Sequence, residues 1–390
     1  MSALVEQATT PHSFNLVLPP GTRRSIHWGQ LHGVSSALLI VATAARYRGL
    51  VLALAPDSQT ATRLEIELRF FGGADLGILA FPDWETLPYD VFSPHQDIVS
   101  QRLATLYRLP QQRHGVLVVS VATLMQRLPP RDYLDRYTLL LKVGERLHLE
   151  PFRQRLEASG YVCVSQAVSR GEFAVRGLIL DLFPMGSERP YRIELFDDEV
   201  ESIREFDPDT QLSITKVAQI ELLPAREFAL DRDTIGRFRQ SWRCRFEGDP
   251  QRSPIYHEVS TGNAPSGIEY YLPLFFEQTA TLFDYLPDAT LAIRLEGVDA
   301  AVVAFQDQLM DRYEQRRHDA ERPPLSPSLL FLDVGQIDKT LAHYPRVDLN
   351  VAGDGEVNFP TALPPALPLE PHSEHPAAAL RTFLGEFPGR

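Results

Sequence analysis

Gly33 could begin a phosphate-binding loop, because a strand–helix junction at this position could hold one. Such a loop requires Gly, Lys and Ser or Thr at the fifth, sixth and seventh positions after its first glycine. These positions hold Leu38, Leu39 and Ile40, so the cation and the close backbone approach to phosphate are both missing. We therefore predict an ordinary packed helix at this point.

A second candidate is the acidic run LFDDEVES, in which Asp197, Asp198 and Glu199 could pass for metal ligands. The preceding YRIELF alternates polar and apolar residues, whereas a strand buried on both faces is continuously apolar. We expect these acids to form a hairpin turn and a solvated edge. The histidines are scattered and no G-x-S-x-G motif occurs, so no catalytic or metal-binding residue is predicted, although a Ser-His-Asp triad built from distant residues stays open.

A third candidate is a protein-binding surface. Arg192 and Phe196 lie four positions apart in YRIELF, so both point to the same face of a strand. A guanidinium beside an exposed aromatic ring is typical of the residues that dominate protein–protein binding energies. Arg176 lies upstream, in SRGEFAVRGLILDLFP. The alternative is a surface arginine with a core phenylalanine, and the residues alone leave both open.

The segment FPDWETLPYDVFSPHQD, residues 81–97, is dense in aromatic residues and prolines. We predict a long ordered loop whose Trp84, Tyr89 and Phe92 insert into a core. The alternative is an exposed binding loop.

Composition limits the class of protein. A chain of 390 residues with 44% hydrophobic residues predicts two to four domains with sizeable cores. A net charge of −13 disfavours non-specific DNA binding, which needs a local excess of cations. The two cysteines, Cys163 and Cys244, lie far apart, as expected for a reducing cytoplasm. No apolar run has the roughly 18 residues of a membrane helix, and the N-terminus lacks a signal-peptide pattern, so we expect no membrane association.

The order of elements predicts an α/β fold. From about Ser25, helical segments alternate with apolar strands such as GLVLALAPD and HGVLVVSV, which is typical of a parallel sheet. The helical segments include 29–48 and 58–72, and Ser58 is the expected N-cap of the second. Near Tyr137 the pattern changes to one helix and several alternating strands, typical of a small antiparallel α+β unit. The predicted divisions are a lead-in 1–24, a parallel α/β domain 25–136, an α+β domain 137–224, a further α+β domain 225–358, and a Pro-rich linker with the start of another domain 359–390.

Long strings of this sequence resemble the N-terminal region of the bacterial transcription-repair coupling factors, the Mfd family. They are FPDWETLPYDVFSPHQDIVSQRLATLYRL, the segment from Ser169 to Gln211, and GIEYYLPLFF. The resemblance covers nearly the whole chain and implies a UvrB-like fold. It implies a RecA-like domain 1a over 25–136 with a degenerate nucleotide loop, a UvrA-binding domain 2 over 137–224, and a domain 1b packed on 1a.

The family pattern, matched residue by residue, implies UvrA contacts at Arg176, Arg192 and Phe196. Between Tyr89 and Gln101 the chain is too short for the long hairpin with which UvrB holds DNA. The resemblance implies a non-catalytic region without a cofactor that recruits UvrA to stalled RNA polymerase. ATP with Mg²⁺, RNA polymerase and double-stranded DNA would bind other domains of the full-length translocase, and a C-terminal domain would cover domain 2. The alternatives are an independent DNA-dependent ATPase and a direct DNA-binding module.

Overall fold

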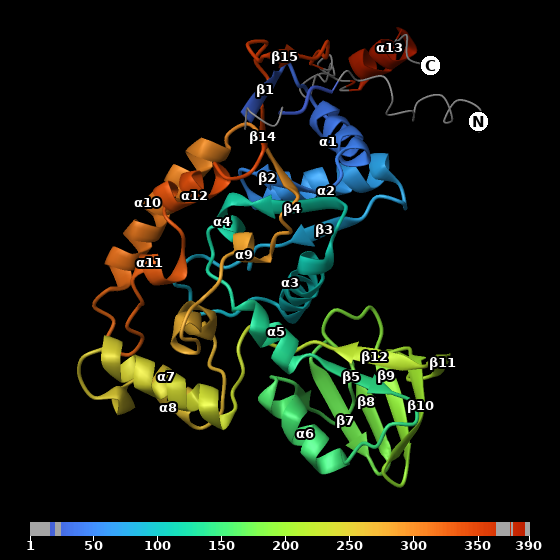
Figure 1. Cartoon of the computed structure of the whole chain (residues 1–390), viewed down its shortest axis with the longest axis vertical. Helices are drawn as coiled ribbons and strands as arrows, with labels where there is room; N and C mark the ends of the chain where they lie inside the picture. Colours follow the sequence, from blue (N-terminus) through green and yellow to red (C-terminus); the bar gives the residue numbers. More distant parts are fainter. Residues whose placement is uncertain (1–15, 20–24, 364–374, 376, 387–390) are drawn as a thin grey trace.

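The computed structural model describes residues 16–19, 25–363, 375 and 377–386. Its largest sheet has seven parallel strands in the order β15-β1-β14-β13-β2-β4-β3 (Figure 1). The predicted α/β class is therefore confirmed. The strands are β1 Ser25–Gly29, β2 Leu50–Ala55, β3 Ile78–Phe81, β4 Gly115–Ser120, β13 Thr290–Arg294, β14 Arg346–Leu349 and β15 Val357–Asn358.

Hydrophobic cores cover both faces of this parallel sheet. In β2, Val51 and Ala53 pack in one core with α1 (Ser35–Arg46) and α2 (Ser58–Gly72). The alternate residues Leu50, Leu52 and Leu54 pack in the second core, which includes residues of α3 (Gln96–Arg108), α4 (Val121–Leu124) and α10 (Val298–Arg316). Burial on both faces explains why β2 and β4 are continuously apolar.

The predicted units 25–136 and 225–358 share this sheet. The later range supplies β13 and β14, which lie between β1 and β2. Parallel neighbours are joined by long crossovers, so the sequence pattern indicates strands without indicating which of them pair. The exact domain boundaries stay a prediction, but the strands of the two ranges form one sheet.

Two local predictions differ from the structure. The segment 29–48 was expected to be helical throughout, but α1 begins only at Ser35, and Ser25–Gly29 before it forms β1. Ser58 was expected to cap α2, yet the N-cap is Asp57, whose carboxylate accepts a hydrogen bond from the Thr60 backbone N–H at 2.7 Å. Asp and Ser are about equally favourable at the N-cap position. The sequence therefore did not show which of the neighbours Asp57 and Ser58 caps the helix.

The range 137–224 folds around a six-stranded sheet in the order β11-β10-β9-β8-β7-β6, at the lower right of Figure 1. Its pairs are antiparallel except β6 with β7. The bounds are β6 Val162–Cys163, β7 Glu172–Arg176, β8 Ile179–Leu182, β9 Tyr191–Phe196, β10 Glu199–Phe206 and β11 Ser213–Val217. A separate antiparallel pair joins β5 Leu139–Lys142 to β12 Gln219–Leu222.

The remaining helices connect and flank these sheets. They are η2 Leu109–Gln111, α5 Arg131–Tyr137, α6 Leu149–Ala158, α7 Arg232–Arg245, η3 Pro250–Arg252, α8 Pro254–Ser260, η4 Ile268–Leu274, α9 Leu282–Tyr285, α11 Pro327–Leu330, α12 Val334–Leu341 and α13 Ala378–Glu386. Only residues 16–19 of the predicted lead-in 1–24 are described, and most of the predicted linker lies outside the described residues. Helix α13 falls within the predicted range 359–390.

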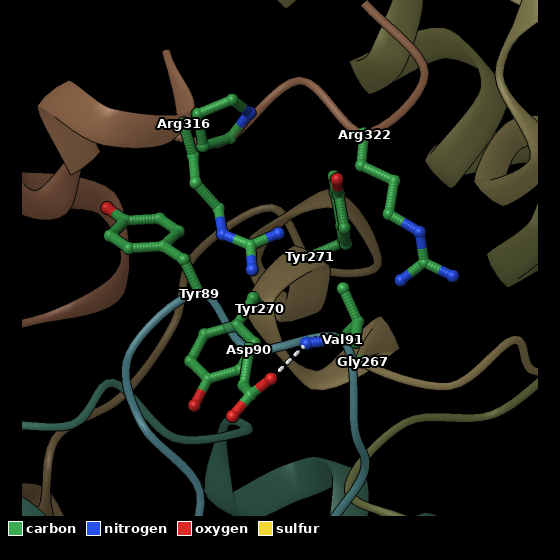
Figure 2. Close-up of a pocket in the computed structure, with 9 residues that line it drawn as sticks. Tyr89, Asp90, Val91, Gly267, Tyr270, Tyr271, Arg316 and Arg322 are labelled. Atoms are coloured by element: carbon green, nitrogen blue, oxygen red, sulfur yellow. Dashed lines mark hydrogen bonds between the residues drawn. The ribbon is translucent and has the colours of Figure 1, made fainter. Parts of the chain in front are cut away.

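The aromatic loop 81–97 inserts into the core at two of its three predicted positions. Trp84 and Tyr89 are buried, but Phe92 is 65% exposed. Tyr89 donates a hydrogen bond to the Leu325 carbonyl at 2.8 Å and stacks on Tyr270 at 5.9 Å between ring centroids. Figure 2 shows these two rings side by side, with the Arg316 side chain reaching toward them.

The space beside these rings is small. The hollow lined by Tyr89, Tyr271, Arg316 and Arg322 has a volume of about 20 Å³, enough for roughly one water molecule. This part of the loop therefore packs against segments that are distant in the sequence and leaves no room for a ligand larger than water.

A buried ion pair ties α3 to the chain that leaves the α+β unit. Arg102 Nε donates to Glu227 Oε1 at 2.7 Å, and both side chains are almost fully buried. The Arg102 guanidinium also lies over the rings of Phe81 and Trp84, at 4.3 and 5.1 Å from their centroids. One cation therefore joins three segments that are distant in the sequence.

We predict that Arg102→Ala or Glu227→Ala lowers the free energy of unfolding by about 3–5 kcal/mol, because either change leaves the partner charge buried and unpaired. Urea denaturation followed by circular dichroism measures the change. The exposed Arg69–Glu65 pair on α2 is the matched control, and Arg69→Ala should cost about 0.5 kcal/mol or less. Equal losses for the two arginine variants would contradict the structural role given to Arg102.

Candidate protein-docking face

Alternation along the strands divides the six-stranded sheet into two faces. The inner face carries buried apolar residues, among them Phe173, Leu180, Ile193 and Leu195, which pack in one core with Phe152 and Leu156 of α6. The strand registers place a different set on the opposite side. We call this the outer face, and it comprises Arg176, Ile179, Asp181, Arg192, Glu194 and Phe196.

A buried carboxylate lies at the centre of the outer face. Asp181 is fully buried and directly opposite Arg192 in the register of β8 and β9. Arg192 donates from Nε to Asp181 Oδ1 at 2.7 Å and from Nη2 to Oδ2 at 2.9 Å. Arg176 donates to the same Oδ2 from its own Nη2. One carboxylate therefore accepts hydrogen bonds from both predicted arginines.

Arg192 is held on several sides. Its Nη1 donates to the Gln211 carbonyl at 3.2 Å, and its guanidinium carbon lies 5.0 Å from the centroid of the buried Phe206 ring. The hydrogen bonds to Asp181, together with the attraction of that carboxylate, raise the pKa of Arg192, so it stays charged. Only 18% of its side chain is exposed.

Glu194 holds a second ion pair on the outer face. It lies 3.2 Å from Arg204 of β10 and accepts a hydrogen bond from the Ser202 hydroxyl at 2.6 Å. The charges of this pair balance one another.

Phe196 lies at the end of β9, where it is 74% exposed. Phe196 pairs with Glu199 across a two-residue turn formed by Asp197 and Asp198, and Asp197 has a positive φ of 61°. The turn expected from the acidic run is therefore present. An aromatic ring this exposed at a hairpin end is available to a partner.

The structure thus brings the three predicted partner-binding residues to one face, but with unequal access. Phe196 and Arg176 are exposed, whereas Arg192 is largely covered and packs on Phe206 and not on Phe196. Asp181 and Ile179 were not among the residues predicted for this face. Their positions opposite Arg192 and Arg176 follow only from the strand register, which one strand's pattern does not reveal.

The predicted degenerate nucleotide loop lies between β1 and α1. Gly33 has a positive φ of 56° in this connection, and Leu38 lies in α1. Leu39 and Ile40, at the positions of the P-loop cation and hydroxyl, are buried in the core between α1 and the sheet. These side chains serve packing.

A hollow of about 400 Å³ lies beside Gly33, at the carboxyl ends of the parallel strands. Its charged lining residues are Arg63, Glu67 and Glu296, and burial raises the pKa of Glu67. Two carboxyl groups against one guanidinium disfavour a triphosphate.

Metal-binding clusters and membrane-spanning helices are also absent from the described residues. Within the part of the chain that the structure describes, no group of three His, Cys, Asp or Glu side chains is arranged to hold a metal ion. Among the same residues, no helix has both the length and the apolar character to cross a bilayer.

Comparison with known proteins gives a consistent set of relatives. Residues 139–228 match the model of the UvrB interaction domain family. The chain is 42% identical over 386 residues to the transcription-repair-coupling factor of Escherichia coli (strain K12), covering 97% of this chain and 33% of that protein. Identity to the one from Haemophilus influenzae is 42% over 361 residues, with 91% and 31% covered. The one from Bacillus subtilis is 30% identical over 233 residues, with 56% and 20% covered. The chain thus spans about a third of the length of its first relatives.

Proposed function

Since the chain belongs with the transcription-repair-coupling factors over the third of their length that it spans, we propose that it recruits UvrA to RNA polymerase stalled at DNA damage. In this proposal the chain is a non-catalytic adaptor in the bacterial cytoplasm. Its outer face offers UvrA a surface like that of UvrB. The whole protein then links transcription to nucleotide excision repair.

The main support is the outer face itself. It lies within the residues that match the UvrB interaction domain, and it presents Arg176 and Phe196 to solvent. An exposed aromatic ring with a charged guanidinium on the same face is a typical anchor for a protein partner. Of the three residues named from the sequence, Arg176 and Phe196 are open to a partner, whereas Arg192 is largely covered.

The non-catalytic assignment is supported by the Gly33 region. The residues at the cation and hydroxyl positions of a P-loop are apolar and buried, and the nearby hollow has more acids than bases. An independent ATPase would have to bind phosphate there without a lysine. We propose that this chain holds no cofactor and that ATP with Mg²⁺ acts in other domains of the family's proteins.

The remaining partners belong to the whole protein. We propose that RNA polymerase and double-stranded DNA bind through other domains of the relatives. A further proposal is that a C-terminal domain covers the outer face until the protein engages its target. Exposure of Phe196 in the present chain is compatible with such a cover, because a large exposed apolar group often marks an interaction site.

We predict that Phe196→Ala weakens UvrA binding by about 1–3 kcal/mol, because the ring would lose a desolvated contact in the complex. Isothermal titration calorimetry of the whole chain with UvrA measures the change. Phe70→Ala is the matched control, since Phe70 is also exposed, at 80%, but belongs to α2, which lies beside the parallel sheet and away from the six-stranded sheet (Figure 1). Unchanged affinity for the folded Phe196 variant would reject this site.

A second prediction concerns nucleotide. Millimolar ATP with Mg²⁺ should leave the thermal unfolding temperature unchanged, because a ligand that binds only the folded state would raise it. Mg²⁺ alone is the control in the same thermal-shift experiment. A rise that grows with ATP concentration would contradict the degenerate assignment of the Gly33 loop.

A further inference from the structure

Three arginines line a hollow at the amino ends of the parallel strands. Arg48 lies two residues before β2, Arg113 lies two residues before β4, and Arg131 is the first residue of α5. All three are exposed, and the hollow has a volume of about 520 Å³. The hollow beside Gly33 lies at the carboxyl ends of the same sheet, so the two sites are at opposite ends of the strands.

The register of the parallel sheet brings this set of residues together. Strand β2 lies between β13 and β4, and the first residues of the three strands are paired. Asp288, Arg48 and Arg113 each precede their strand by two residues, so they lie side by side along one edge. A Cβ atom on Gly49 would lie 2.1 Å from the Ala289 carbonyl oxygen, so the glycine allows the chains before β2 and β13 to approach each other.

The three guanidinium groups are not neutralised within the described part of the chain. None of them forms an ion pair there, and their side chains donate one long hydrogen bond, from Arg131 Nη1 to the Asp284 carbonyl at 3.5 Å. Asp288 is the one acidic residue in the lining, so three guanidinium groups against one carboxylate leave an excess of two positive charges. This local excess runs against the net charge of −13 of the whole chain.

The rest of the lining is mainly apolar. Its uncharged residues are Pro110, Gln112, Leu286, Pro287 and Ala289. A concave site with apolar walls and a few charged groups is suited to a side chain that projects from a partner. Arginine is enriched at such sites, and its planar guanidinium can bind both oxygens of a carboxylate.

The flanking charges disfavour a nucleic acid in this hollow. Asp132 follows Arg131 in α5, Asp284 offers its carbonyl to Arg131, and both aspartates are exposed. Duplex DNA carries a phosphate charge about every 1.7 Å along its axis, so a duplex on this edge would meet these carboxylates as well as the arginines. Phosphates bound to Mg²⁺ already have their charge paired. A protein segment can place carboxylates at the arginines and uncharged residues beside the aspartates.

We propose that this hollow docks a partner protein through an acidic segment, whose carboxylates bind Arg48 and Arg113 and whose apolar side chains pack on Leu286 and Pro287. Arg131 adds to the positive potential of the hollow. The inference goes beyond the proposed function, because the hollow belongs to the parallel sheet and the proposed UvrA surface to the six-stranded sheet. The chain then has two separate docking sites.

A short acidic peptide tests the charge preference of the hollow. The probe is a fluorescent peptide with two glutamates and two leucines, and its control has glutamines in place of the glutamates. Fluorescence anisotropy with the whole chain should show binding of the acidic peptide and about tenfold weaker binding of the glutamine peptide, because only the first presents carboxylates. Equal affinities for the two peptides would overturn the inference.

Single variants locate the binding site. Arg48→Gln and Arg113→Gln should each weaken binding of the acidic peptide about fivefold, the upper range for an exposed ion pair. Neither change should alter the thermal unfolding temperature, because neither side chain has a partner among the described residues. Arg63→Gln on α2, where the side chain is 70% exposed, is the matched control and should leave the affinity unchanged. An equal loss for Arg63→Gln would show that the peptide senses only net charge.

Two other occupants are distinguished by the same variants. A labelled DNA duplex should bind more weakly than the acidic peptide. Tighter binding of the duplex, lost in Arg48→Gln, would make the hollow a nucleic-acid site and overturn the inference. Sedimentation of the chain alone should show no association that depends on Arg113. A dimer that Arg113→Gln dissociates would show that a second copy fills the hollow, which would also contradict a separate partner.

Discussion

The outer face depends on one constraint, which is that the inner face of the same sheet is fully committed to the core. Ile193 and Leu195 of β9 are buried, so the alternate residues Arg192 and Phe196 must point outward. A shift of β9 by a single residue would bury the charges and expose the apolar side chains. The core therefore fixes the register, and the register brings Arg192 opposite Asp181. Every contact on the outer face follows from this arrangement.

Residues of the parallel-sheet unit are likewise committed to packing. Leu39 and Ile40 fill the core at positions where a nucleotide-binding chain would place a cation and a hydroxyl. The later strands β13 and β14 complete the sheet, and Arg102 joins α3 to Glu227 at the exit from the α+β unit. These contacts connect the parallel sheet to the unit that carries the outer face.

Features that depend on neighbouring residues were predicted from the sequence, whereas features that depend on contacts between distant residues were not. Local patterns were sufficient for α2, for the apolar strands β2 and β4, and for the turn at Asp197, because period and turn chemistry act within a few residues. The strand β1 was missed since SIHWG is short and mixed in character, and the pairing of β13 with β2 depends on contacts more than 200 residues apart in sequence. Burial of Asp181 under two arginines likewise requires the register. Phe92 was expected in the core but is exposed, because hydrophobic character alone does not determine burial.

Hydrogen–deuterium exchange of the whole chain, alone and with UvrA, tests the central claim most directly. The account predicts that UvrA slows exchange of the backbone amides in β7, β8, β9 and the turn at Asp197, and leaves α2 and the Gly33 connection unchanged. Protection confined to α2 or to the parallel sheet, with the outer face exchanging as before, would contradict it.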